Sequence, residues 1–327
     1  MNSRLERRTK SINVLPGFLF FCVLVLLFLL VSLEPFKAYA EEPVTGVTYF
    51  DSITEDEEGF RIYYPMNVFW EPVKEELYIL VGGSRMLIYS ADFFPLFTID
   101  KKKGIGSPSG LAVDTDGNLY VSQGSSAGNT RARISVFNAR LIFERDIYPE
   151  GFEGDDSFVP GSLSLDKKGN LLVTGSPLGV LYMDKQGRFI DMISPEEKGE
   201  KVRVTNAAVG KDGTIYLLSD EESRVYVYDS ERKFLFEFGE KGGSSGKLSR
   251  PSGVAVDDDN GLIYVSDYMR HTVNAYDKSG KFAFEFGGIG WSAGWFQYPS
   301  AICIDGEGKV LVADLFNHRV QVFKPNK

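Results

Sequence analysis

Gly287 to Val322 reads GGIGWSAGWFQYPSAICIDGEGKVLVADLFNHRVQV. In this stretch a glycine-rich loop ends in an aromatic residue and a proline. Two short apolar segments then flank an Asp-Gly-Glu-Gly turn, and an Asp-x-x-Asn-x-Arg-Val corner leads into a third apolar segment. Glycine supplies the positive φ that a tight hairpin requires. The stretch therefore predicts three short antiparallel strands joined by turns.

The same pattern recurs along the chain, and the residue that opens each innermost strand is the best marker of it. The separations between successive openings lie between 43 and 52 residues. Four-stranded propeller blades repeat at about 40–50 residues, so six openings predict six blades. The openings are Pro65, Pro108, Pro160, Thr205, Pro251 and Pro299, and the clearest copies are Pro108–Asp114, Pro251–Asp257 and Pro299–Asp305.

These repeats resemble the NHL repeat, the blade unit of one class of β-propeller. The resemblance is strong from Leu235 onward, fair over 104–137 and looser in the first, third and fourth blades. It implies an all-β fold over residues 41–327, a six-bladed propeller of four-stranded antiparallel blades preceded by an N-terminal hydrophobic helix. It also implies a binding role, without naming the partner.

Closure of the ring is predicted from the two ends of this region. The last repeat stops after three strands, whereas Val44–Ile53 reads as a lone strand before the acidic segment Glu55–Glu58. A propeller that is not closed leaves a strand edge exposed. We therefore expect strand 44–53 to pair with the last blade, 299–323, as its outer strand.

Phenylalanine alternates along two predicted outer strands, Phe234–Phe238 and Phe282–Phe286. Alternate residues of a strand point to the same side of its sheet. We expect these side chains to form core between neighbouring blades rather than a ligand site.

The N-terminal residues have the pattern of a targeting segment. Basic residues between Arg4 and Lys10 precede an apolar run from Phe18 to Leu33, and Ala38-Tyr39-Ala40 has the small-x-small pattern of a signal-peptidase site. Residues 1–40 are predicted to be a signal peptide or an N-terminal membrane anchor, since the run is intermediate in length. Either alternative places the propeller outside the cytoplasm. It would be periplasmic or secreted, or anchored to the outer side of the cytoplasmic membrane.

The net charge of the chain narrows the classes of partner. The chain has 36 basic and 45 acidic residues, and without residues 1–40 these become 31 and 43, a net charge of −12. An acidic surface repels phosphate backbones, so we expect no nucleic-acid partner.

The chain has two cysteines. Cys22 lies in the N-terminal segment, and Cys303 alternates with isoleucines in a predicted strand, so Cys303 is interpreted as a buried apolar residue.

Loops of the propeller are expected to segregate to two faces. The turns between first and second and between third and outer strands share one face, here called the hairpin face. The turns between second and third strands and the blade-to-blade connectors share the other, the connector face, which has the longer and more variable segments. Loops on a rigid scaffold are where recognition usually resides. The candidate binding residues are Trp291, Trp295, Tyr298, Tyr268, Arg270, His271, Phe316, Asn317 and His318.

A structural role competes with this interpretation. In NHL repeats the aromatic residue before the proline, here Phe296 or Tyr298, commonly wedges between blades. The corner residues commonly bond within their own loop; here these are Asp267, Asp314, Asn317 and Arg319.

Catalysis finds little support in the sequence. Two histidines, His271 and His318, cannot build a three-histidine zinc site. Aspartates such as Asp114 precede glycine turns, where they commonly cap the turn. We expect no catalytic residue, metal or cofactor.

The leading hypothesis is a non-catalytic platform for a protein partner in the cell envelope. A glycan or cell-wall ligand is the second hypothesis, and a channel-centred, lactonase-like hydrolase or lyase is the third. A membrane contact is expected through residues 1–40 if they are retained.

Overall fold

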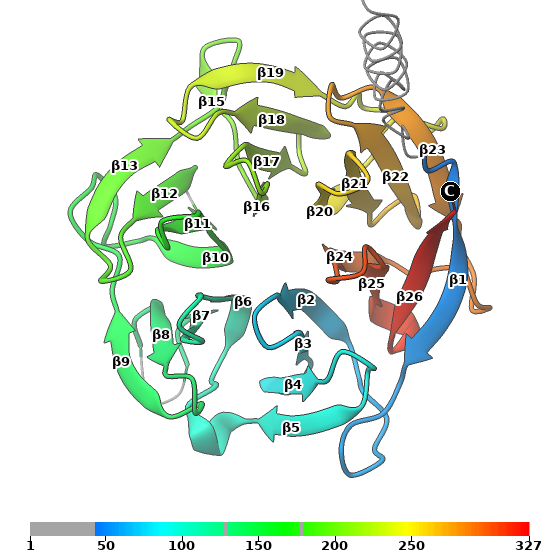
Figure 1. Ribbon diagram of the computed structural model, residues 1–327. Coiled ribbons are helices and arrows are strands. Elements are labelled where there is room, and N and C mark those ends of the chain that lie inside the picture. Colours follow the sequence, from blue (N-terminus) through cyan, green and yellow to red (C-terminus); the bar gives the residue numbers. More distant parts are fainter. Residues whose placement is uncertain (1–42, 127–129, 177–178, 327) are drawn as a thin grey trace, which may run out of the picture. The chain divides into compact units, whose positions relative to one another are not determined.

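The computed structural model describes residues 43–126, 130–176 and 179–326. Six four-stranded antiparallel sheets surround a central axis, as Figure 1 shows, and the prediction of an all-β six-bladed propeller is confirmed. The segment predicted to be a signal peptide or anchor lies outside the described residues. Within the described ranges, no helix combines the length and the apolar character that crossing a bilayer requires.

Blades 1 to 3 follow one another along the chain, each with its innermost strand first. Blade 1 contains β2 (Pro65–Glu71), β3 (Glu76–Val81), β4 (Arg85–Tyr89) and β5 (Pro95–Ile99). Blade 2 contains β6 (Pro108–Val113), β7 (Leu119–Gln123), β8 (Arg133–Phe137) and β9 (Phe143–Ile147), and blade 3 contains β10 (Val159–Leu165), β11 (Leu171–Ser176), β12 (Val180–Met183) and β13 (Phe189–Ile193).

Blades 4 to 6 complete the ring. Blade 4 contains β16 (Asn206–Val209), β17 (Ile215–Ser219), β18 (Arg224–Tyr228) and β19 (Phe234–Phe238), and blade 5 contains β20 (Pro251–Asp257), β21 (Leu262–Asp267), β22 (Thr272–Asp277) and β23 (Phe282–Gly287). Blade 6 contains β24 (Pro299–Ile304), β25 (Val310–Asp314), β26 (Arg319–Asn326) and β1 (Gly46–Ile53). Blade-to-blade connectors carry the short 3-10 helix η1 (Lys101–Lys103) and the small hairpin of β14 (Glu196–Glu197) and β15 (Glu200–Lys201). The corner of blade 6 forms η2 (Leu315–Asn317).

The sixth blade takes its outer strand from the start of the described chain. β1 pairs antiparallel with β26, with Gly46 opposite Asn326 and Ile53 opposite Val320. A bulge between Tyr49 and Asp51 interrupts the register. The first and last strands of the propeller are thus neighbours in one sheet, so β1 covers the edge of β26 and is the outermost strand of blade 6, as β5 is of blade 1.

The hydrophobic core consists of six clusters, one at each junction between neighbouring blades. At the junction of blades 6 and 1, Ile53, Leu77 and Leu311 belong to the same buried cluster. Middle strands such as β17 are buried along their whole length because each sheet is covered on both sides. Burial of this apolar area stabilises the ring, and Cys303, the one cysteine in residues 43–326, is free.

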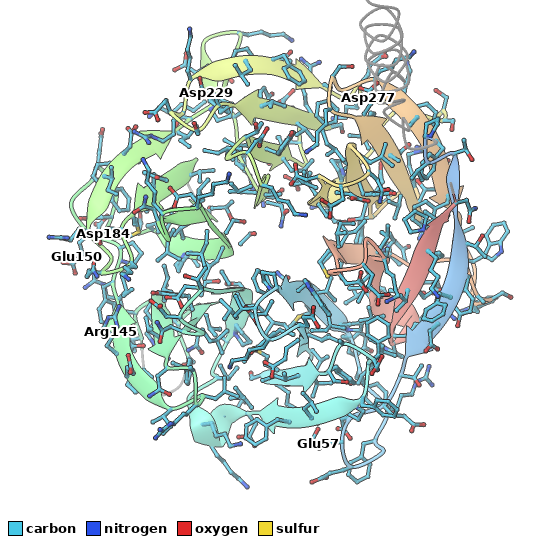
Figure 2. All side chains as sticks on the ribbon, viewed as in Figure 1. Glu57, Arg145, Glu150, Asp184, Asp229 and Asp277 are labelled. Atoms are coloured by element: carbon cyan, nitrogen blue, oxygen red, sulfur yellow. The ribbon has the colours of Figure 1, made fainter. Side chains whose placement is uncertain are left out.

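Outer strands are only partly covered, because they form the perimeter of the ring. Phe238 of β19 is buried, but Phe234 at the other end is 47% exposed. The prediction that the whole phenylalanine stripe is core is therefore wrong for Phe234, whose ring meets Tyr228 on one side and solvent on the other. Figure 2 shows charged side chains such as Asp184, Asp229 and Asp277 around this outer rim.

Candidate interaction surface on the connector face

The central channel is lined by the innermost strands and is mainly apolar. It contains a cavity of about 350 Å³ whose lining includes Val68, Leu111, Leu163, Val254 and Ile302. In the described part of the chain, no group of three histidine, cysteine or acidic side chains could hold a metal ion. The channel therefore offers apolar contacts rather than a carboxylate cluster.

Aspartates at the ends of innermost strands cap the hairpin turns. Asp114 accepts hydrogen bonds at Oδ1 from the backbone N–H groups of Asp116 (3.0 Å) and Asn118 (2.8 Å). Asp305 accepts in the same way from Glu307 (2.9 Å) and Lys309 (2.8 Å). These carboxylates are engaged by the turns that follow them, as the turn chemistry predicts.

Cys303 lies in β24 and is one of the residues that line the channel. Its side chain is buried, and burial raises the pKa of the thiol, with a smaller contribution from the charge of Asp305. A protonated, buried thiol is a poor nucleophile. Cys303 is therefore part of the packing of the innermost strands.

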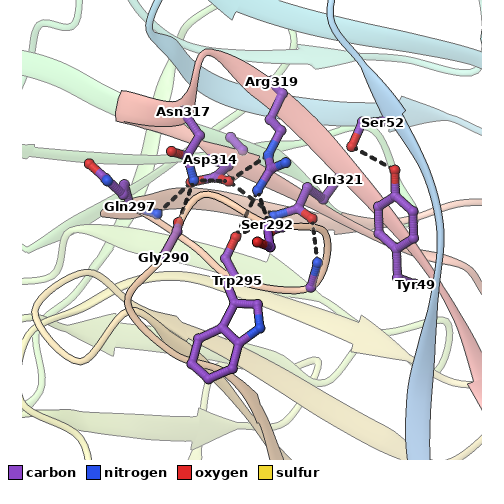
Figure 3. Close-up of polar contacts among 12 residues, drawn as sticks. Tyr49, Ser52, Gly290, Ser292, Trp295, Gln297, Asp314, Asn317, Arg319 and Gln321 are labelled. Atoms are coloured by element: carbon purple, nitrogen blue, oxygen red, sulfur yellow. Dashed lines mark hydrogen bonds and ion pairs between the residues drawn. The ribbon is translucent and has the colours of Figure 1, made fainter.

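The corner of blade 6 is organised by a buried carboxylate, Asp314, shown in Figure 3. It accepts hydrogen bonds from the Gln297 backbone N–H (2.6 Å), Asn317 Nδ2 (2.8 Å) and Arg319 Nε (2.9 Å). Burial raises the pKa of Asp314, and these three donors oppose the increase. The corner fastens the connector 288–298 to blade 6. Asn317, a candidate binding residue, is buried within this network.

The corner of blade 5 repeats this arrangement. Asp267 accepts hydrogen bonds from the backbone N–H groups of Ser249 (2.6 Å) and Arg250 (3.1 Å), so it holds the preceding connector. Arg270 donates to the carbonyl of Lys247 (2.7 Å) and forms an ion pair with Glu285 (2.8 Å). Only 11% of the Arg270 side chain is exposed, so its charge is used inside the protein.

Both histidines bridge neighbouring blades through the same pairing with a tyrosine. His271 Nδ1 accepts a hydrogen bond from the backbone N–H of Tyr298 (3.0 Å), and His318 Nδ1 accepts one from Tyr64 (3.2 Å). The ring centroids lie 4.4 Å and 4.5 Å apart in edge-to-face contacts. An accepting Nδ1 requires the neutral imidazole. Burial lowers the pKa of both histidines.

The four residues of these pairs have positive φ angles: 59° for both histidines, 51° for Tyr64 and 58° for Tyr298. Positive φ is uncommon for a residue with a bulky side chain. The two tyrosines immediately precede the prolines that open β2 and β24. Each of these four residues places its aromatic ring at a junction between two neighbouring blades.

Five aromatic side chains form a connected series on the connector face, which we call the aromatic arc: Tyr268, Tyr298, Phe316, Tyr64 and Tyr63. Ring centroids are 4.7 Å apart between Tyr268 and Tyr298, 5.3 Å between Tyr298 and Phe316, and 5.8 Å between Phe316 and Tyr64. His318 joins Tyr63 to the series at 5.2 Å. The arc crosses blades 5, 6 and 1. Tyr63 is 54% exposed, and Tyr64 and Phe316 are each 44% exposed.

Tyr63 and Tyr64 were missed by the sequence analysis, because the first blade matches the repeat pattern only loosely. A usable signal was present, since Tyr64-Pro65 has the same dipeptide as Tyr298-Pro299. The structure gives the two tyrosines equivalent positions, each bonded to the histidine of the preceding corner.

The tryptophan loop lies apart from the arc. Trp291 is 78% exposed, and among the described residues no ring contact joins it to the aromatic arc. Trp295 packs its ring over Gly288 and Gly290, and its carbonyl accepts hydrogen bonds from Arg319 and Gln321. Phe296 is the residue that wedges between blades 5 and 6, fully buried against Phe286 and Phe323.

At its blade 5 end the arc borders a polar pocket. A cavity of about 250 Å³ is lined by Tyr268 together with Thr205, Asp220, Arg250 and Ser252. Arg250 Nε lies 3.7 Å from Asp220, and 61% of the Arg250 side chain is exposed. The connector face thus combines exposed aromatic rings with an accessible guanidinium group beside them.

Comparisons with known proteins agree with the repeat pattern. The NHL repeat family model matches residues 248–276 and 296–323. No curated protein sequence matches the chain. Similar solved structures include an auxiliary nutrient binding protein from Bacteroides ovatus (13% identity, 86% of this chain and 76% of that chain, TM-score 0.63). A Bacteroides thetaiotaomicron protein of unknown function (15%, 87% and 73%, 0.60) and a streptogramin B lyase (10%, 87% and 100%, 0.58) are also similar. At these identities the similarity shows the fold alone.

Proposed function

We propose that this chain, a six-bladed β-propeller with NHL repeats, is an exported, non-catalytic platform that binds a partner protein through the aromatic arc. The observation that carries the proposal is the continuous series of rings across three blades, of which Tyr63, Tyr64 and Phe316 are exposed and Tyr268 and Tyr298 half-buried. Soluble proteins leave large aromatic side chains clustered on their surface mainly at sites of interaction.

The chemistry of the arc suits a protein partner. Tyrosine offers a large contact area with few rotatable bonds and a hydroxyl group that can bond across an interface. The rings are held by corners whose polar groups are already bonded, such as that of Asp314. A surface that is ordered before binding loses little conformational entropy when the partner docks.

Backbone strain is present at this surface, as it is in turns elsewhere in the propeller such as those of Phe93 and Leu141. Tyr64 and Tyr298 have positive φ angles, which cost roughly 1–3 kcal/mol each for such residues. Strained residues cluster at functional sites because the surrounding structure must maintain them. In this chain the strain sets the rings of both tyrosines in the arc.

Charge near the arc favours a basic partner surface. The connector that leads to Tyr63 carries Glu55, Glu57 and Glu58 on exposed positions, against one exposed basic residue, Arg61. Complementary charge accelerates encounter and disfavours acidic partners. We therefore expect weaker binding as ionic strength rises.

The proposal is tested by affinity capture from envelope extracts with matched variants of the full chain. Tyr63→Ala/Phe316→Ala removes two rings of the arc, whereas Phe234→Ala removes a ring of similar exposure from outer strand β19. We expect the double variant to lose the captured partner by at least tenfold and Phe234→Ala to retain it. Equal capture by both variants would show that the arc is not the contact.

A glycan or cell-wall ligand is the second candidate, and exposed Trp291 is the observation that favours it. Sugar rings stack on aromatic faces, and Trp291 is free to offer one. Trp291→Ala should abolish retention on isolated cell wall while leaving partner capture unchanged. Retention that survives this substitution would show that Trp291 is not the contact, and a lack of retention of the unmodified protein would remove the glycan hypothesis.

Catalysis in the channel is the third candidate. The streptogramin B lyase supports it only in that its fold is similar. The apolar channel lining does not favour it. A lactonase-like or lyase activity would need chelator-sensitive turnover. Assays of lactone substrates with and without chelator separate this candidate from a binding platform.

A further inference from the structure

The direction of the strands in blade 6 fixes where the chain enters the propeller. β26 starts directly after the corner Leu315–His318 on the connector face and therefore ends, at Asn326, on the hairpin face. β1 runs antiparallel to it, with Gly46 opposite Asn326. The chain preceding β1 consequently reaches the propeller at the hairpin face, opposite the aromatic arc.

Ten residues separate the apolar run Phe18–Leu33 from Val44. An extended chain spans at most about 3.3–3.6 Å per residue, so this segment can reach roughly 35 Å. With the apolar run held in a bilayer, the point at which the chain enters the propeller would lie within this reach of the membrane.

The hairpin face of blades 1 and 2 carries exposed apolar side chains on its turns. Val73 lies in the turn between β2 and β3, Phe94 in the turn before β5, and Ile142 in the turn before β9. Each is more than half exposed. Apolar side chains at the tips of neighbouring turns are positioned to enter the boundary of a bilayer together.

Basic side chains accompany these tips, although the protein as a whole is acidic. Exposed Lys74 and Arg140 flank the tips themselves, and Lys167, Lys168 and Lys185 follow on blade 3. The turns of blades 2 and 3 border one hollow lined by Asp116, Lys167, Lys168 and Lys185. Exposed acids in the same region are fewer: Glu75, Asp92, Glu144 and Asp116, the last of which lies 3.7 Å from Lys185.

We propose that the hairpin face of blades 1 to 3 is a membrane-contact surface for an anionic lipid bilayer. Val73, Phe94 and Ile142 enter the headgroup region, where amphipathic surfaces insert by about 5–10 Å. Lys74, Arg140, Lys167, Lys168 and Lys185 lie against anionic headgroups. The aromatic arc then projects away from the bilayer, where a partner in the envelope can reach it. This surface is separate from the arc, so either proposal can fail alone.

The test uses the full chain in vesicles of phosphatidylglycerol and phosphatidylcholine that contain nitroxide-labelled lipid. An environment-sensitive fluorophore is attached at Ile142→Cys or, on the connector face, at the exposed Met269→Cys, with Cys22 and Cys303 replaced by Ser and Ala. We expect the lipid to quench the label at position 142 several-fold more than the label at 269. Equal quenching at both positions, or none at 142, would overturn the proposal.

The contribution of charge is tested in the same vesicles. Lys167→Glu/Lys168→Glu should reduce quenching at position 142 by at least half. The matched control is Lys101→Glu/Lys102→Glu, two adjacent exposed lysines of η1 on the connector face, which should leave quenching unchanged. Circular dichroism verifies that each variant is folded. Quenching that is equal in vesicles of phosphatidylcholine alone would refute an anionic bilayer as the ligand.

Discussion

Tyr64 donates its backbone N–H to Nδ1 of His318 over 3.2 Å, although 254 residues separate the two in sequence. The same bond joins Tyr298 to His271, between blades 5 and 6. The junction at which the ring closes, between blades 6 and 1, is therefore built like an internal junction. Closure has two parts, the β1 strand on the outside of blade 6 and this bond near the innermost strands.

His318→Phe should destabilise the protein by about 0.5–1.5 kcal/mol, because the ring is kept while the partly exposed Tyr64 N–H loses its acceptor. Urea denaturation at neutral pH measures the free energy of unfolding. His271→Phe removes the equivalent acceptor of Tyr298 and should have a similar effect. A free energy of unfolding that stays within error of wild type would contradict the structural role of the bond.

Stability should also decrease on acidification in the range where histidine titrates. Burial lowers the pKa of His271 and His318 in the folded state below the ordinary value of 6.5. In that window the unfolded chain binds more protons, so the histidine contribution is complete above about pH 6.5 and is lost as pH falls through the folded pKa. Urea denaturation across this range should show a smaller slope for His271→Phe/His318→Phe than for wild type. Equal slopes would contradict neutral, accepting imidazoles.

Ile53→Ala should cost about 2–5 kcal/mol, because Ile53 is the buried end of β1 at the junction of blades 6 and 1. Phe50→Ala, in the same strand but 45% exposed, is the matched control and should cost much less. Thermal and urea unfolding give the comparison. Equal losses would mean that β1 does not close the ring through this cluster.

Asp314→Ala should destabilise by about 3–5 kcal/mol, since Arg319 and the N–H of Gln297 would lose a buried partner. The connector 288–298 should then become sensitive to limited proteolysis. Asp92→Ala, at an exposed turn, provides the control and should change neither quantity. Protection of the connector in Asp314→Ala would show that the corner does not hold it.

The architecture could be predicted because its signals are local. Proline openings, glycine turns and short apolar runs specify hairpins, and their spacing gives the number of blades. The arc could not be predicted as a unit, because its rings come from blades 5, 6 and 1 and meet only after closure. Tyr63 was missed because the first blade matches the repeat pattern only loosely. Asn317 is bonded within its corner, as the competing structural role anticipated, whereas the bonds of Arg270 to its neighbouring connector were not anticipated. Phe234 shows a second limit of the sequence analysis. Alternation along a strand predicts the side of the sheet on which a side chain lies, but not whether another blade covers that side.

Site-specific photo-cross-linking in intact cells tests the central claim most directly. A benzoylphenylalanine replaces Phe316 or Tyr63 in the arc, or Phe234 on outer strand β19 as the control. Binding through the arc predicts one protein adduct of the same mass from positions 316 and 63 and none from position 234. No adduct from the arc positions, or the same adduct from position 234, would contradict it.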